Sequence, residues 1–283
     1  MNRARIVVVM LVLTTFALAQ QAAPPNATPP AAQQPGATPP ATPPAGPPGK
    51  SQPKPKTQAE ADAYKAAMAI TDPVAMEKAA NDFAVTYPAS DLSPLLFRMV
   101  MRTYQGANNS DKLLEMGEKL LQTDPDDPEA LIDVAQVITE RTRETDIDKD
   151  QRRDKAMKYA EHALQTVDTD VPLGLAPEQE ALFKALMRSN AYSVIGLLQF
   201  NEGKFDLAAG SFRKSIDAFP QQPDPVTILR LAFALDKQGK YPEALTEAKH
   251  SVELTQDGTT AGTLARREQD RLVKLTSGAA PKK

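Results

Sequence analysis

Few residues of this chain have side chains that commonly catalyse reactions or bind metals. It contains no cysteine and only two histidines, His162 and His250, which excludes disulfides, zinc-thiolate sites and cysteine nucleophiles. Neither histidine lies at a spacing from an acidic or nucleophilic residue that is typical of a catalytic triad. We therefore expect a non-enzymatic protein without cofactor or metal, and both histidines in packing or surface roles. An enzyme built on carboxylates is the alternative.

Two groups of aspartates have spacings that resemble metal sites. Asp146, Asp148 and Asp150 alternate like the start of a calcium-binding loop, but Gln151 stands at the turn glycine and Met157 at the closing glutamate. This predicts solvent-facing charge and not a calcium site.

The second group consists of Asp124, Asp126 and Asp127, interleaved with Pro125 and Pro128. Proline at these positions favours a turn, and an aspartate just before a helix caps its free N–H groups. We expect a turn followed by a capped helix here.

The first 19 residues have the pattern of a secretory signal peptide. Arg3 and Arg5 precede an apolar run over residues 6–18, and the segment closes with small residues at Ala19. That run is shorter than the roughly 20 residues that a membrane-spanning helix needs. We predict cleavage after Ala19, no stable membrane insertion, and a periplasmic or secreted protein. The alternative is an uncleaved segment that tethers the chain to the inner membrane.

Residues 20–56 predict a disordered spacer. They hold 13 of the 25 prolines and no acidic residue, a composition that buries too little apolar surface to offset its ordering entropy. The segment is either a stalk or a flexible leader without specific contacts. Residues 277–283 are expected to form a disordered tail.

The chain is acidic from residue 57 onward, with 28 Lys and Arg against 36 Asp and Glu, a net charge of −8. Affinity for nucleic acid comes mostly from neutralised phosphates, and single-strand binders need aromatic stacking surfaces. Aromatic residues make up only 5% of the chain. Nucleic acid is therefore not an expected partner.

Residues 57–276 predict paired short helices. Apolar residues recur at three- and four-residue spacing between Pro, Gly and Asp. The clearest unit covers residues 189–222; its key positions are Tyr192, Ile195 and Gly196, then Gly203 and Phe205, then Ala208, Phe212 and Ser215. A second unit places Gly239 and Ala244 each 36 residues after Gly203 and Ala208.

This spacing resembles the tetratricopeptide repeat, whose signature is W-x2-L-G-x2-Y, then A-x3-F, then P. The resemblance implies an all-α, tetratricopeptide-type helix-turn-helix solenoid of about five helix pairs over residues 57–276, with a C-terminal capping helix. Small residues at Gly196 and Ala208 are expected to admit large neighbours such as Phe212. The family's leading tryptophan is absent, and Tyr192 and Phe97 can fill its volume.

Two stretches break the even period. About nine extra residues separate two helices around residues 140–153, and an unusually long helix is expected from residue 177 to about 201. The curvature of the solenoid is expected to change there.

Tetratricopeptide solenoids bind a segment of another protein in a concave groove, mostly with the first helix of each pair. Carried over by position, the resemblance implies that the groove presents Arg98, Arg102, Gln136, Asn190, Ser193, Asn201, Phe233 and Lys237. Arg98 and Arg102 lie one helical turn apart and together could hold a partner's carboxylate; the alternative for each residue is a solvated face. The Lys and Asn combination of chaperone-binding members is missing, so a C-terminal peptide ligand is not expected.

We therefore predict an exported scaffold or adaptor that binds a protein or peptide segment of unknown identity, in assembly or maintenance of the cell envelope. The alternative is a binding module for a cell-wall or exopolysaccharide chain, with Tyr64, Tyr104, Tyr192 and Phe233 as stacking surfaces.

Overall fold

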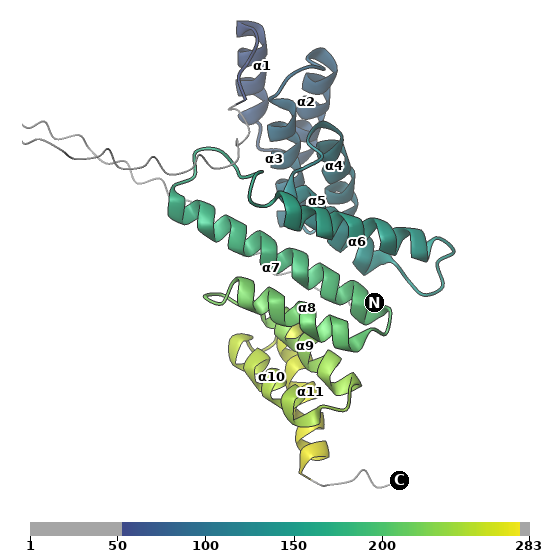
Figure 1. The fold of residues 1–283 in the computed structure, drawn as a ribbon. Coiled ribbons are helices and arrows are strands. Elements are labelled where there is room, and N and C mark those ends of the chain that lie inside the picture. Colours follow the sequence, from purple (N-terminus) through teal and green to yellow (C-terminus); the bar gives the residue numbers. More distant parts are fainter. Residues whose placement is uncertain (1–52, 278–283) are drawn as a thin grey trace, which may run out of the picture.

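The structure, a computed structural model, describes residues 53–277. The predicted signal peptide, residues 20–52 of the predicted spacer and residues 278–283 of the predicted tail lie outside the described residues. Within residues 53–277 there are eleven α-helices and no strand (Figure 1). The helices are α1 (Gln58–Met68), α2 (Pro73–Thr86), α3 (Ser93–Gly106), α4 (Ser110–Thr123), α5 (Pro128–Arg141), α6 (Lys149–Thr166), α7 (Pro177–Asn201), α8 (Phe205–Ala218), α9 (Pro225–Lys237), α10 (Tyr241–Leu254) and α11 (Thr260–Thr276).

The helix starts follow local signals in the sequence. Proline is the first residue of α2, α5, α7 and α9, where its missing N–H is no loss. Side-chain oxygens of Asp72, Asp127 and Asp224 accept hydrogen bonds from backbone N–H groups of the following helix. The predicted cap within the 124–128 turn is therefore confirmed, and Asp127 provides it.

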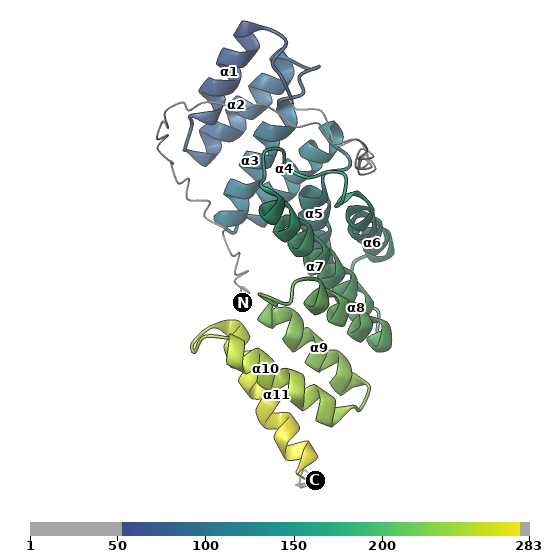
Figure 2. The same ribbon diagram turned by 60° about the vertical axis from the view of Figure 1, so that its left-hand side comes forward.

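The helices follow one another in chain order along an elongated stack, from α1 at one end to α11 at the other (Figures 1 and 2). Each packs mainly on its neighbours in the chain, so that α1 to α10 form five antiparallel pairs and α11 covers the last pair. The predicted all-α solenoid of five pairs plus a final helix is confirmed. Among the described residues, no helix has both the length and the apolar content to cross a membrane.

Small residues let neighbouring helices approach closely, within the pair α7–α8 and between the successive pairs that meet at α4 and α5. A Cβ added to Gly196 would lie 2.6 Å from the Phe212 ring, and one added to Gly117 would lie 2.5 Å from Val134 Cγ2. The predicted fit of Gly196 against a large neighbour is confirmed, and Phe212 is fully buried. Both contacts thus need a residue without a side chain.

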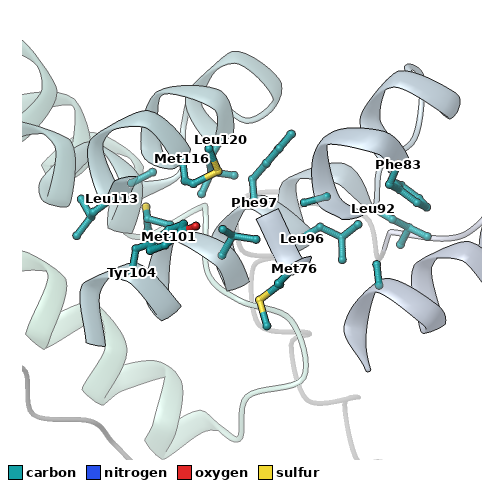
Figure 3. Close-up of a cluster of buried hydrophobic side chains, with 14 of the residues drawn as sticks. Met76, Phe83, Leu92, Leu96, Phe97, Met101, Tyr104, Leu113, Met116 and Leu120 are labelled. Carbon is teal, nitrogen blue, oxygen red and sulfur yellow. The ribbon is translucent and has the colours of Figure 1, made fainter. Parts of the chain in front are cut away.

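The core is divided into three apolar clusters along the stack. The first joins α1 to α5 and contains Phe83, Leu96 and Met101 (Figure 3). The second joins α4 to α7. The third joins α8 to α11 and includes Leu235 and Leu272. Helix pairs are therefore held together by their neighbours and not by one central core.

Both predicted irregularities occur, and the first has a different form from the one expected. The extra residues between α5 and α6 make a short loop over residues 142–148 and lengthen α6 to 18 residues. Much of the insertion is thus helical, because α6 starts earlier than the repeat pattern predicts. α7 has 25 residues, as predicted, and none of residues 177–186 is buried.

Candidate partner-binding face

The odd-numbered helices line the inner side of the stack. Contacts between alternate helices join α1 to α3, α5 to α7, α7 to α9 and α9 to α11; no two even-numbered helices within residues 53–277 make contacts of similar extent. Elements on the inner side of a curved stack are closer together than those outside, so the odd helices form its concave side. The resemblance placed the candidate residues on these same helices.

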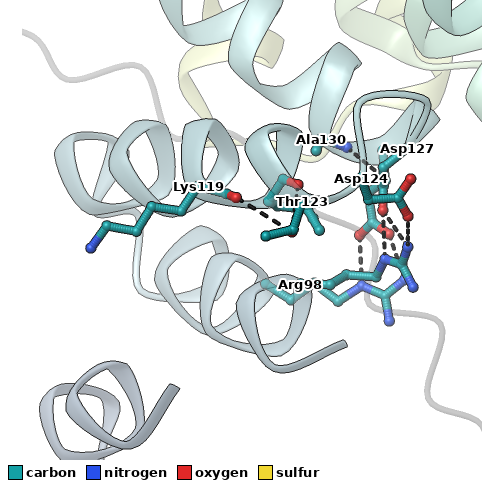
Figure 4. A network of polar contacts seen from close by, with 9 residues as sticks. Arg98, Lys119, Thr123, Asp124, Asp127 and Ala130 are labelled. Carbon is teal, nitrogen blue, oxygen red and sulfur yellow. Dashed lines mark hydrogen bonds and ion pairs between the residues drawn. The ribbon is translucent and has the colours of Figure 1, made fainter. Parts of the chain in front are cut away.

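Arg98 connects α3 to the start of α5 (Figure 4). Its Nε donates to Asp127 Oδ2 at 2.8 Å, its Nη2 contacts the same oxygen, and Asp124 Oδ2 is 3.7 Å from Nη2. The Arg98 side chain is 14% exposed and that of Asp127 only 1%. Asp127 also caps α5, since its Oδ1 accepts from Ala130 N at 2.9 Å. The expected role of Arg98 in holding a partner's carboxylate is therefore corrected: its donors already bind this chain's own carboxylates.

Arg102 forms the next link between the same helices. Its Nε and Nη2 donate to the two carboxylate oxygens of Glu129 at 2.6 and 2.5 Å. This fork geometry is the strong form of an arginine–carboxylate pair. Half of the Arg102 side chain is exposed, so a contact with a partner stays a prediction for this residue.

Asp133 is the most unusual titratable group of the inner side. Its side chain is buried and its Oδ2 accepts from Gln105 Nε2 at 3.0 Å. Burial raises the pKa of Asp133 well above its usual range, and the nearby Glu129 and Asp127 carboxylates raise it further. Arg102 opposes this shift without cancelling it.

Polar links continue along the inner side to the C-terminal end. Ser193 Oγ of α7 lies 2.8 Å from Thr227 Oγ1 of α9. Glu140 Oε1 of α5 lies 3.8 Å from Arg230 Nη2 of α9. Asp236 Oδ1 of α9 pairs with Arg271 Nη2 of α11 at 2.5 Å. Many polar groups of this face thus bind one another, which fixes the relative positions of the odd helices.

The structure spreads the predicted binding residues over four helices and does not gather them into one pocket. Gln136 Nε2 donates to Glu140 Oε1 at 3.1 Å on α5. The side chains of Asn190, Asn201 and Lys237 make no hydrogen bond or ion pair with any described residue, and their polar groups are available to a partner. Asn201 and Lys237 are exposed and Asn190 is half-buried.

Phe233 lines a hollow between α9 and α11. The other lining residues are Asp257, Gly258, Thr263, Leu264, Arg266, Arg267, Glu268, Asp270, Arg271 and Lys274. The sequence analysis assigned α11 only as a capping helix and missed its contribution to this hollow. The recurrence of Leu264, Arg267, Arg271 and Lys274 at three- and four-residue spacing could have indicated one shared face.

Two features recur in successive helix pairs. Gly203 and Gly239, 36 residues apart, follow the first helices α7 and α9 with φ of 75° and 74°, a conformation that favours glycine. The first helices also line the inner side. The fold is a tetratricopeptide-type solenoid.

Comparison with known proteins finds similar solved structures at low identity. No protein-family model matches the chain, and no curated protein matches it. The crystal structure of TTC0263, a thermophilic TPR protein of Thermus thermophilus, is 15% identical, with a TM-score of 0.47 over 76% of this chain and 99% of that one. A structure described as MamA MSR-1 C2 is 18% identical, with a TM-score of 0.40 over 67% and 100%. The assembly chaperone of RpL4, Acl4, is 12% identical, with a TM-score of 0.37 over 77% and 98%.

Asp146 and His162, two residues considered for metal binding and catalysis, have local structural partners. Asp146 Oδ2 accepts from Arg143 N at 2.9 Å and lies 3.4 Å from Arg152 Nη1. His162 Nε2 lies 2.8 Å from Asp126 Oδ1 and links α6 to the turn before α5, a contact that the sequence spacing did not indicate. Within residues 53–277, no group of three or more His, Asp or Glu side chains could hold a metal ion.

The aromatic residues considered for carbohydrate stacking do not form a shared surface. Tyr104 is buried, and its hydroxyl donates to Glu77 Oε2 at 2.5 Å. Tyr64 packs edge-on against Phe83. The expectation that Tyr104 presents a stacking face is therefore wrong, because its ring fills the α2–α3–α4 contact.

Proposed function

We propose that this chain is an exported, non-catalytic scaffold that docks a segment of another protein along the inner side of its solenoid, in assembly or maintenance of the cell envelope. The continuous inner face made by α3, α5, α7, α9 and α11 carries the proposal. Because these helices are linked by Arg98–Asp127, Glu140–Arg230 and Asp236–Arg271, the face is preorganised and loses little conformational entropy on binding.

The groups that remain for a partner support a binding role. Asn190, Asn201 and Lys237 offer donors and acceptors without internal partners in the described part of the chain, and half of Arg102 is exposed. Such groups at separate points along a curved face suit an extended segment that contacts several helices in turn. A periplasmic or secreted location is proposed on the signal-peptide pattern of residues 1–19, with an inner-membrane tether as the alternative.

Site-specific photo-crosslinking in living cells tests the docking face. A photoreactive amino acid at Gln136, on the inner side of α5, is expected to capture one discrete protein. The matched control carries the same amino acid at Lys158, an exposed α6 residue whose side chain has no hydrogen bond or ion pair among the described residues. Identical crosslinked products from both positions, or none from Gln136, would contradict the proposal.

Export is tested separately by cell fractionation and N-terminal sequencing. The mature chain is expected outside the cytoplasm and to begin at Gln20. A chain that retains residue 1 and remains with the inner membrane would support the tethered alternative, and a cytoplasmic chain would contradict export.

A further inference from the structure

A hollow lies between α9 and α11, on helices of the inner side. Phe233 of α9 faces the Leu264, Arg267, Arg271 and Lys274 side of α11 there. Helices α9 and α11, which line the hollow, lie at the C-terminal end of the stack (Figure 2). A partner segment that runs along the inner face from α3 toward α11 would contact this hollow last.

Some charges around the hollow are already neutralised within the chain. Arg266 pairs with Asp257. Arg271 Nη2 lies 2.5 Å from Asp236 Oδ1 and 2.7 Å from Glu268 Oε1, and these hydrogen bonds raise the pKa of Arg271. These residues form the fixed walls of the hollow.

Around the hollow, three cationic side chains have no ion-pair partner among the described residues. Arg267 and Lys274 line the hollow, and Lys237 follows Phe233 by one turn of α9; all three are exposed. Asp270 is the only lining carboxylate that makes no ion pair within residues 53–277. With Lys237 and Asp236 included, the charged residues around the hollow are five cations and four carboxylates, a net charge of +1, against −8 for the chain from residue 57 onward. An isolated cationic site on an acidic protein attracts anionic groups at close range.

The hollow also has apolar surface. Phe233 is half-buried and Leu264 is 43% exposed, so an aromatic ring and an aliphatic side chain border the unpaired cations. Apolar anchors surrounded by charged groups are the usual composition of a binding hot spot and its rim.

The chain's own undescribed segments do not have the complementary charge. Residues 1–52 contain no Asp or Glu and three Lys or Arg, and residues 278–283 contain two Lys and no acidic residue. Neither segment would neutralise the cations of the hollow. Their charge therefore argues against both segments as the occupant of the hollow.

We propose that the α9–α11 hollow binds an acidic segment of a partner protein, in which an apolar side chain lies among Asp or Glu residues. The apolar side chain packs on Phe233 and Leu264 while the carboxylates pair with Lys237, Arg267 and Lys274. This inference rests on the proposed docking function and specifies the chemistry of the partner at one end of the face.

Binding of defined peptides to the full chain tests the inference. The probe is a short fluorescein-labelled peptide with a Leu-Phe pair between runs of Glu; the comparison peptide has Lys in place of every Glu. Fluorescence anisotropy is expected to detect binding of the Glu peptide alone, with affinity that falls as salt rises. No binding of the Glu peptide, or equal binding of both peptides, would overturn the proposal.

Charge reversal at exposed positions locates the site. The double variant Arg267→Glu with Lys274→Glu is expected to weaken binding by about tenfold or more, since it replaces attraction with repulsion. The matched control, Lys158→Glu with Lys249→Glu, changes exposed α6 and α10 lysines and is expected to remain within about twofold of the unchanged chain. Thermal unfolding by circular dichroism verifies that both variants are folded. Equal weakening in the two double variants would overturn the assignment.

Two further measurements distinguish other occupants. Vesicles of phosphatidylglycerol and phosphatidylcholine test an anionic membrane, and sedimentation velocity tests a second copy of the chain. Vesicle binding or self-association that is lost in the Arg267→Glu, Lys274→Glu variant, without loss of peptide binding, would overturn the proposed partner class.

Crosslinking separates this inference from the proposed function. A photoreactive residue at Leu264 is expected to capture the same protein as one at Gln136. Capture at Gln136 with none at Leu264 would leave the docking function standing and overturn the role of the hollow. Absence of capture at both positions would overturn both.

Discussion

At the scale of single residues, Asp127 has two structural roles. It caps α5 through Ala130 N and pairs with Arg98 of α3 while almost completely buried. A buried carboxylate that loses its ion-pair partner keeps the penalty of desolvation without the compensating attraction. Arg98 is therefore a structural residue of the repeat, although its position on the inner side made it a candidate for binding.

We expect Arg98→Met to destabilise the protein by about 3 kcal/mol, because it leaves the Asp127 charge buried and unpaired. Arg102→Met is the control; its side chain is half exposed, so its pair with Glu129 contributes no more than about 1 kcal/mol. Urea unfolding followed by circular dichroism measures both. Equal losses in the two variants would contradict the structural role of Arg98.

A second residue-scale prediction concerns Asp133, whose pKa is raised in the folded state by burial and by Glu129 and Asp127. The folded protein then holds a proton that the unfolded chain releases near pH 4. Stability due to this group is therefore complete below that pH and is lost as pH rises toward the folded pKa, by at most about 1.4 kcal/mol per pH unit.

Asp133→Asn is expected to remove this fall in stability and to give a more stable protein at neutral pH. Thermal midpoints of both proteins between about pH 3 and 8 test this, because groups other than Asp133 affect both profiles alike. Parallel profiles would show that Asp133 is ionised in the folded protein.

At the scale of helices, the distance between neighbouring helices depends on single glycines. Phe212 of α8 occupies the space beside Gly196 of α7, and Val134 of α5 occupies the space beside Gly117 of α4. A methyl group at either position would force a packed side chain or the helix itself to move. Glycine is thus a steric requirement of one contact within a helix pair and of one contact between successive pairs.

Gly196→Ala is expected to destabilise the protein by roughly 1–3 kcal/mol through the clash with Phe212. Gly210→Ala is the matched control, since a Cβ there meets nothing within 4 Å; it is expected to stabilise α8 by about 0.5–1 kcal/mol. Thermal unfolding compares the two. A stabilising Gly196→Ala would show that the α7–α8 contact is looser than described.

At the scale of the whole molecule, stability is distributed along the stack. Three core clusters follow one another, and each helix depends on its neighbours. The last cluster is closed by Leu272 of α11, which is fully buried. A destabilising substitution in one cluster is therefore expected to lower the local stability mainly of the helices that form that cluster.

Leu272→Ala is expected to remove about 2–5 kcal/mol of local stability by leaving a cavity under α11. Hydrogen exchange measured by mass spectrometry should show faster exchange in α9, α10 and α11, with unchanged exchange in α2 to α5. A uniform increase over all helices would indicate one cooperative unit and contradict the distributed description.

The sequence alone determined the architecture and much of the local structure. Apolar spacing, proline at helix starts and the 36-residue interval between Gly203 and Gly239 predicted paired helices, the long α7 and the final helix. These features are set by contacts between residues close in the chain, which the order of residues specifies directly. The fit of Gly196 against Phe212 could be predicted for the same reason, because the two residues are only 16 positions apart.

Only the tertiary structure decided which charges remain for a partner. Arg98 and Asp127 are 29 residues apart, and their pairing depends on how α3 is rotated against α5. How successive helix pairs pack also decides that Tyr104 is buried and that Phe233 faces α11. Small rotations of each helix determine whether a side chain lies in a contact or on the inner face, and those rotations follow from packing across helices, which no short-range pattern in the sequence specifies.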